Sequence, residues 1–164
     1  MSKKLFELDK TLKNFLMAII FVMSCGVITG LIYLNYTTGY SSEGTSLRFN
    51  GSNETSSEDD FEIPDNYPKP VSEMLITTHN HILGFSFIFF IIGSIFYFNS
   101  IIEDFWKTFL LVEPIISVLI TFGSLWLMRY YDSNFVYLAI LSSTVLYLSY
   151  FIMAFVSLYE LKFK

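Results

Sequence analysis

The chain has 164 residues, of which 53% are hydrophobic, 19% aromatic and 15% charged, and its net charge is −5. A composition this apolar and aromatic excludes an ordinary soluble domain. The negative net charge and the absence of a basic patch argue against nucleic acid as a partner.

Four long apolar blocks follow one another along the chain, over residues 15–34, 74–102, 108–128 and 133–159. Glu113 is the only Asp, Glu, Lys or Arg in them. A helix needs about 20 apolar residues to cross a bilayer, and it satisfies its own backbone there. The sequence therefore predicts an all-α integral membrane protein, a four-transmembrane-helix bundle. The predicted spans are residues 15–34, 71–99, 105–128 and 133–159.

The distribution of basic residues predicts the orientation of the bundle. Seven lysines lie in the two terminal tails and in the connection between the second and third spans, whereas the opposite side has three basic residues. By the positive-inside rule, both termini are cytoplasmic. We expect a multi-pass protein of the bacterial inner membrane. Its cytoplasmic tails are residues 1–14 and 160–164, and residues 35–70 are periplasmic.

The outer loop, residues 35–70, contains seven acidic residues. Its first half is rich in Ser, Gly, Asn and Thr, a composition typical of a flexible segment. Two interpretations of the acidic loop remain. It is either a solvated linker or a docking surface for a basic periplasmic partner such as a cytochrome c, since complementary charge accelerates encounter.

Both histidines lie in the stretch T-T-H-N-H, at the entrance of the second span. Residues two apart in a helix point about 200° apart, so His79 and His81 cannot both face the bundle interior. We expect His81 to face inward, because it shares a face with Thr77 and Gly84. Ionisable groups at membrane depth are costly and suggest function. Four roles remain: hydrogen bonding across helices, ligation of haem b, ligation of copper, and proton transfer or quinone contact.

A haem would need either a second axial ligand or an open site. Met128 projects to a similar depth and is a candidate for the second ligand. A homodimer or another membrane subunit would be the other source of that ligand, because the sequence contains no third histidine.

Short connections make the last three spans antiparallel neighbours. At about 1.5 Å per residue, His79 and His81 are predicted to lie level with Leu125 and Gly123. Small residues predominate at this depth, namely Thr29, Gly30, Gly84, Gly123, Ser124, Ser142 and Ser143. Two explanations fit: close helix packing, to which a G-x-x-x-G pair of Gly26 and Gly30 would contribute, and room for a flat cofactor.

Glu113 is a carboxylate within the third span, followed by Pro114. It is about 15 Å along the helix axis from His81, so the two are not expected to pair. It is either a protonated or hydrogen-bonded carboxyl at a helix kink, or a functional group in a proton relay or a contact to a partner helix.

The motifs G-L-I-Y-L, T-T-G-Y, K-P-x-S-E-M-L and T-T-H-N-H resemble those of a group of small bacterial four-span membrane proteins over residues 26–98. This resemblance implies no activity. The first two spans are also similar to those of the main subunits of haem–copper oxidases and nitric oxide reductases. In that family a histidine at the outer end of the second span ligates haem, which implies such a role for His79 or His81. The chain lacks the family's further histidines, so oxygen or nitric oxide reduction by this chain alone is not expected.

Together these patterns predict a small polytopic membrane subunit that binds haem b or copper through His81 or His79 and belongs to a respiratory or electron-transfer complex. The alternative is a non-catalytic structural or assembly protein whose histidines only form hydrogen bonds across helices. In neither case is the chain expected to be an enzyme on its own.

Overall fold

The computed structural model describes residues 4–52 and 66–164, in which every regular element is a helix. The elements are η1 (Leu5–Glu7), α1 (Lys10–Thr38), α2 (Ser42–Asn50), α3 (Val71–Tyr97), α4 (Asp104–Tyr130) and α5 (Phe135–Phe163). The four long helices have 27 to 29 residues and are long and apolar enough to cross a membrane. At about 40 Å each, they exceed the roughly 30 Å of a hydrocarbon core. The predicted all-α, four-span fold is confirmed.

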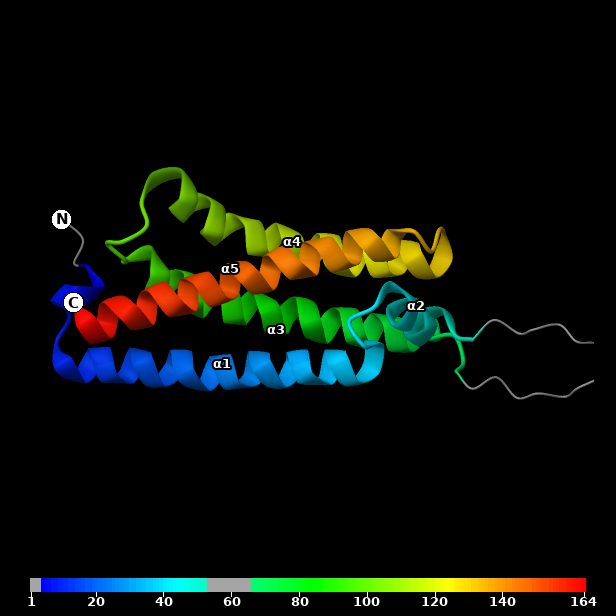
Figure 1. Cartoon of the computed structure of the whole chain (residues 1–164), viewed down its shortest axis with the longest axis horizontal. Helices are drawn as coiled ribbons and strands as arrows, with labels where there is room; N and C mark the ends of the chain where they lie inside the picture. Colours follow the sequence, from blue (N-terminus) through cyan, green and yellow to red (C-terminus); the bar gives the residue numbers. More distant parts are fainter. Residues whose placement is uncertain (1–3, 53–65) are drawn as a thin grey trace, which may run out of the picture.

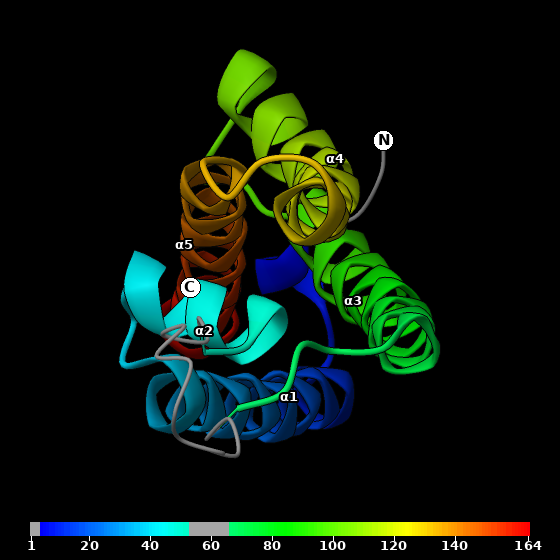
Figure 2. The same cartoon turned by 90° about the vertical axis from the view of Figure 1, so that its right-hand side faces the viewer.

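The four long helices lie side by side in one bundle (Figures 1 and 2). The start of α1 and the end of α5 lie together, at what we call the termini end. The short helix α2 lies across the opposite end, which we call the α2 end. α3 and α5 each contact the three other spans, and the contacts of α5 are the more extensive.

The most extensive contact between two helices is that of α4 with α5. Buried residues recur along α4 at intervals of three and four, at Leu110, Pro114, Ser117, Thr121, Ser124 and Met128. α5 presents Ala139, Ser142, Leu146, Ser149 and Met153 at the same intervals. This repeat is typical of left-handed coiled-coil packing. Many of these side chains are small, so the two backbones can approach closely. Such close packing holds helices together in a bilayer, where the hydrophobic effect does not drive them to associate.

Side-chain hydrogen bonds join α1, α5 and α4 in series. Ser24 of α1 forms a hydrogen bond with the Tyr150 hydroxyl of α5, at 3.1 Å. Thr121 of α4 forms another with Ser142 of α5, at 2.8 Å. Such bonds across membrane helices are each worth about 0.6 to 1.7 kcal/mol. They fix the rotation of α5 relative to its two neighbours.

A further hydrogen bond joins α4 to α3 and sets their register. The indole Nε1 of Trp126 donates to Thr78 Oγ1 at 2.9 Å. The His81 ring lies 5.2 Å from the ring of Phe122, one helical turn further along. The sequence predicts that His79 lies level with Leu125 and His81 with Gly123. Both contacts agree with this alignment within one residue, so the alignment is confirmed.

The connection between α3 and α4 is held by Asn99, which is 0% exposed. The side-chain oxygen of Asn99 accepts hydrogen bonds from the backbone N–H groups of Ile101 and Ile102, and its amide nitrogen donates to the Phe96 carbonyl. Lys107 Nζ donates to the Asn99 carbonyl at 2.9 Å. One buried side chain therefore determines the path of the whole turn.

The last turn of α5 fastens this connection to the bundle. Glu160 is completely buried, and its Oε2 accepts a hydrogen bond from the Ser100 backbone N–H at 2.7 Å. The Leu5 N–H donates to the Phe98 carbonyl, so η1 packs on the same connection. The tails predicted at residues 1–14 and 160–164 thus contain ordered helix in their described parts.

The prediction of a flexible first half of the outer loop is wrong, because Ser42–Asn50 forms α2. The Ser41 hydroxyl caps this helix by accepting the Gly44 N–H at 2.9 Å. Phe49 is buried and anchors the helix over the bundle end. It packs in a cluster with Met74, Met128 and Val136. The buried Phe49, the Ser41 cap and a hydrogen bond from the Lys69 N–H to the Phe49 carbonyl hold this segment, although its composition is polar.

Candidate functional site

His81 lies at the edge of the contact between α3 and α4. Its Nδ1 is 2.8 Å from the Thr77 carbonyl oxygen, one turn earlier in α3. Its ring lies near the rings of Phe122 and Phe85, with centroid distances of 5.2 and 6.2 Å. His81 is nevertheless exposed on the bundle surface, so the expectation that it faces the bundle interior is wrong. Among the described residues its hydrogen bond stays within α3 and does not reach another helix.

His79 and Asn80 are also exposed. The two imidazoles therefore do not converge on one point inside the bundle, as the 200° separation predicts. Any ligand that His81 holds would lie at the surface of this chain rather than between its four spans.

Met128 is 2% exposed. Its side chain packs in the apolar cluster of Phe49, Met74 and Val136 beneath α2. Phe122, which His81 contacts, belongs to the other, larger apolar cluster. The structure therefore does not bring Met128 and His81 together as a pair of axial ligands.

Glu113 lies in the contact between α4 and α5. Its Oε2 accepts a hydrogen bond from Ser149 Oγ of α5 at 2.8 Å, and its Oε1 accepts one from Ser117 Oγ, a turn further along α4. Ser117 and Ser149 are both buried. These contacts match the hydrogen-bonded carboxyl expected from the sequence, and the proton-relay role stays a prediction.

The layer of small residues is divided between the inside and the outside of the bundle. Ser124 and Ser142 are buried. A Cβ atom placed on Gly26, Gly30 or Gly84 would meet no other part of the described chain within 4 Å. Within residues 4–52 and 66–164, the G-x-x-x-G pair therefore does not pack against another helix.

A copper site gains no support from the part of the chain that the structure describes. No group of three or more His, Cys, Asp or Glu side chains gathers within residues 4–52 and 66–164. Cys25 is free and exposed on α1.

A hollow of about 430 Å³ opens at the α2 end, between the end of α1, α2 and the segment before α3. It is lined by Tyr33, Tyr36, Thr37, Thr38, Gly39, Gly44, Leu47, Arg48, Asn66 and Lys69. Two of these residues are cations, and none of this lining is Asp or Glu. We call this site the α2-end hollow.

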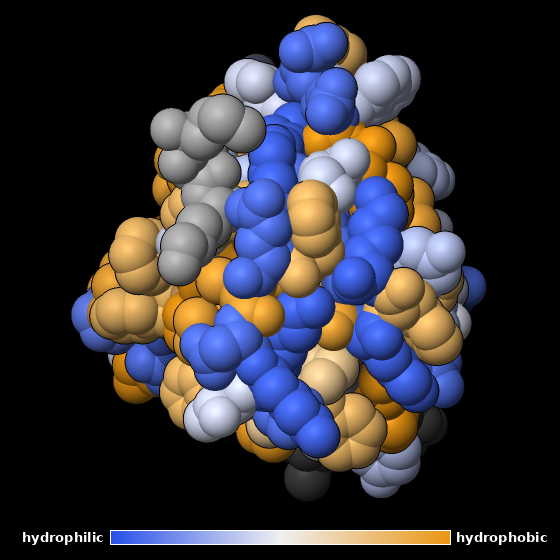
Figure 3. All heavy atoms as spheres, turned by 90° about the vertical axis from the view of Figure 1, so that its left-hand side faces the viewer, coloured by the Kyte–Doolittle hydropathy of each residue, from blue (hydrophilic) through white to orange (hydrophobic). Residues whose placement is uncertain are grey.

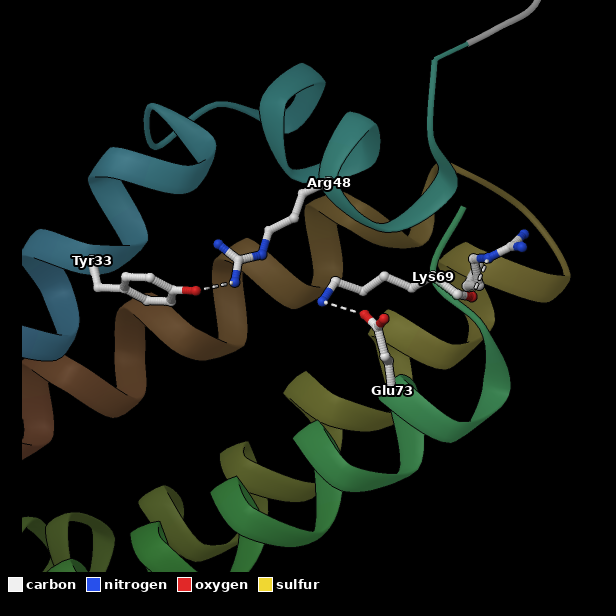
Figure 4. A network of polar contacts seen from close by, with 5 residues as sticks. Tyr33, Arg48, Lys69 and Glu73 are labelled. Carbon is white, nitrogen blue, oxygen red and sulfur yellow. Dashed lines mark hydrogen bonds and ion pairs between the residues drawn. The ribbon is translucent and has the colours of Figure 1, made fainter. Parts of the chain in front are cut away.

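Arg48 lies on α2 and Lys69 in the segment just before α3 (Figure 4), and both line the hollow. Arg48 Nη2 donates to the Tyr33 hydroxyl at 3.2 Å, and its guanidinium carbon lies 5.0 Å from the centre of that ring. Lys69 Nζ is 3.6 Å from a Glu73 carboxylate oxygen. Sequence reasoning missed this site, because Arg48 was counted only for membrane orientation and α2 was not predicted.

A second hollow, of about 460 Å³, lies at the termini end between the start of α1 and the end of α5. Its lining includes four cations, Lys10, Lys13, Lys162 and Lys164. Hydrophilic side chains are spread over this end of the molecule (Figure 3). This is the lysine-rich side that the sequence predicts to be cytoplasmic.

Six of the seven acidic residues in the outer loop lie outside the described residues, and so does the predicted docking surface for a basic partner. Glu43 is the exception and lies in the first turn of α2.

The four long apolar helices define a multi-pass, all-α membrane protein. A family model described as a transmembrane helical domain matches residues 39–164. The chain therefore belongs to this family of transmembrane helical domains. The matched part begins directly after α1 and contains α2 to α5. Neither the comparison with curated proteins nor that with solved structures finds a match.

Proposed function

We propose that the protein is a non-catalytic structural subunit of the membrane. The observation that carries this proposal is the series of side-chain hydrogen bonds that links α1 to α5, α5 to α4, and α4 to α3. Polar groups at membrane depth either serve chemistry or hold helices together. In this bundle Tyr150, Ser142, Ser149 and Trp126 each form a side-chain hydrogen bond with a neighbouring helix.

Glu113 supports this interpretation most directly. Both oxygens of Glu113 accept hydrogen bonds from serine hydroxyls, one on α4 and one on α5. The group therefore acts as a bridge between two helices, and its polar atoms are satisfied as the low-dielectric interior requires.

An absorption spectrum with metal analysis tests the proposal. We expect protein purified in mild detergent to show no Soret band and no stoichiometric metal, both before and after incubation with haem. The variants His79→Ala and His81→Ala should unfold at the same temperature as Asn80→Ala, the matched control between them. A Soret band in the wild type that disappears in His81→Ala would contradict the proposal.

Haem ligation by His81 is the second candidate function, and one observation favours it. The contact of Nδ1 with the Thr77 carbonyl fixes the tautomer and leaves Nε2 free, which is how ligating histidines are commonly held. Because His81 is exposed and Met128 packs elsewhere, the described chain offers one suitable axial ligand. The other would come from a second copy or another subunit.

The same spectrum separates the two candidates. A haem site on His81 predicts a Soret band that His81→Ala abolishes and His79→Ala keeps. A Soret band that appears only when the protein is oligomeric would identify the second ligand as one from another chain.

A further inference from the structure

The α2-end hollow contains a guanidinium whose hydrogen bonds are only partly made. Arg48 Nη1 is buried and has no hydrogen-bond partner among the described residues. Buried donors in proteins nearly always have a partner, whether protein, ordered water or ion. A charged donor without one indicates that the site holds a further group when the protein is in its natural surroundings.

The rest of the guanidinium is held in a fixed orientation. The Tyr33 hydroxyl accepts a hydrogen bond from Nη2, and the Tyr33 ring lies against the guanidinium carbon. Lys69 lies on the same hollow, and its side chain is 18% exposed. Two cations therefore line one space, and Lys69 also forms an ion pair with Glu73. The described lining contains no Asp or Glu, so its charge is positive and suited to an anion.

The position of the hollow relative to the bilayer indicates which kind of anion is available to bind there. Its walls include Tyr33 and Thr38, at and just beyond the end of the span predicted at residues 15–34. Headgroup layers extend about 5 to 7 Å beyond the hydrocarbon on each side, and tyrosines gather at that level. The anion present there at the highest concentration is the phosphate group of a phospholipid. Arginine binds phosphate through its planar fork of N–H groups.

We propose that the α2-end hollow binds the phosphate group of a phospholipid from the adjacent leaflet. Arg48 Nη1 donates to the phosphate, Lys69 balances its charge, and the exposed Leu47 at the rim meets the lipid's apolar part. This inference is independent of the structural role proposed above, since it concerns a different end of the chain and different residues.

The test measures thermal unfolding of the full chain in a detergent without phosphate. Three additives are compared: a short-chain phosphatidylglycerol, the diacylglycerol with the same chains, and inorganic phosphate. A ligand that binds only the folded state raises the unfolding temperature in proportion to its occupancy. We expect the phospholipid to stabilise the protein, the diacylglycerol to have no effect, and inorganic phosphate to act only at much higher concentration.

Two variants locate the effect. Arg48→Gln should weaken phospholipid binding by about tenfold or more, the loss expected for a charge-assisted hydrogen bond. Lys162→Gln removes a positive charge at the termini end, the opposite end of the bundle from the hollow, so it should bind as the wild type does. Equal binding by Arg48→Gln and the wild type would overturn the proposal.

The wild-type protein alone also decides the matter, in case Arg48→Gln fails to fold. Equal stabilisation by diacylglycerol and phosphatidylglycerol would show that the phosphate is not recognised, which overturns the proposal. Equal stabilisation by inorganic phosphate and phospholipid at the same concentration would identify a free anion as the ligand and overturn the lipid assignment.

Discussion

The substitution Ser149→Ala tests the role of hydrogen bonds within the bundle most sharply. Ser149 is 2% exposed, and its hydroxyl donates to Glu113 Oε2 at 2.8 Å. Alanine removes this hydroxyl and little else, so the packing of α5 on α4 is retained. A hydrogen bond between membrane helices contributes about 0.6 to 1.7 kcal/mol, and a buried acceptor left without a partner adds to the cost. We expect the free energy of unfolding to fall by about 1 to 2 kcal/mol.

The assay is reversible unfolding in mixed micelles with increasing SDS, followed by tryptophan fluorescence, since Trp106 and Trp126 both lie in α4. Ser143→Ala is the matched control on the same helix, because the Ser143 hydroxyl donates to the Ile140 carbonyl of its own helix. The control should change stability by less than about 0.5 kcal/mol. Equal effects of the two substitutions would refute the reasoning, because they would show that the bond to Glu113 contributes nothing.

Three further substitutions have defined outcomes. Asn99→Ala should lower the free energy of unfolding by about 2 to 3 kcal/mol in the same assay, because it removes three hydrogen bonds of a fully buried turn. Gly44→Ala should displace α2 and speed proteolysis at the α2 end, because its Cβ would lie 2.1 Å from the Thr38 carbonyl oxygen. Gly26→Ala combined with Gly30→Ala should not lower the unfolding temperature, since both positions are open and alanine favours helix by up to about 1 kcal/mol each. A lower unfolding temperature together with reduced cross-linking between copies would instead show that these glycines pack against a second chain.

The spans and their register were predictable because they depend on local quantities. Block length and the absence of charge locate a membrane helix, and a short connection forces the next helix to run antiparallel. Helical rise then aligns residues across the turn, and the contact of Thr78 with Trp126 agrees with the depth predicted for His79 and Leu125.

The partners of individual side chains were not predictable, because they depend on how each helix is rotated about its axis. Glu113 was recognisable as an anomaly, but its bond to Ser149 requires the rotations of both α4 and α5. The same limit applies to His81, whose inward or outward position changes with a modest rotation of α3. α2 escaped prediction because its order depends on Phe49 entering a cluster built from three other helices.

The hydrogen bond of Ser24 with Tyr150 has a consequence for the biosynthesis of the protein. The two residues are 126 positions apart, so α1 leaves the ribosome long before its partner exists. At 5 to 20 residues per second, the delay is roughly 6 to 25 seconds. During that interval α1 must stay in the bilayer by its own affinity for lipid. The sequence of α1 fits this requirement, because its 18-residue core segment is the most apolar of the four spans. The same segment is also the least buried by neighbouring helices once the bundle is complete.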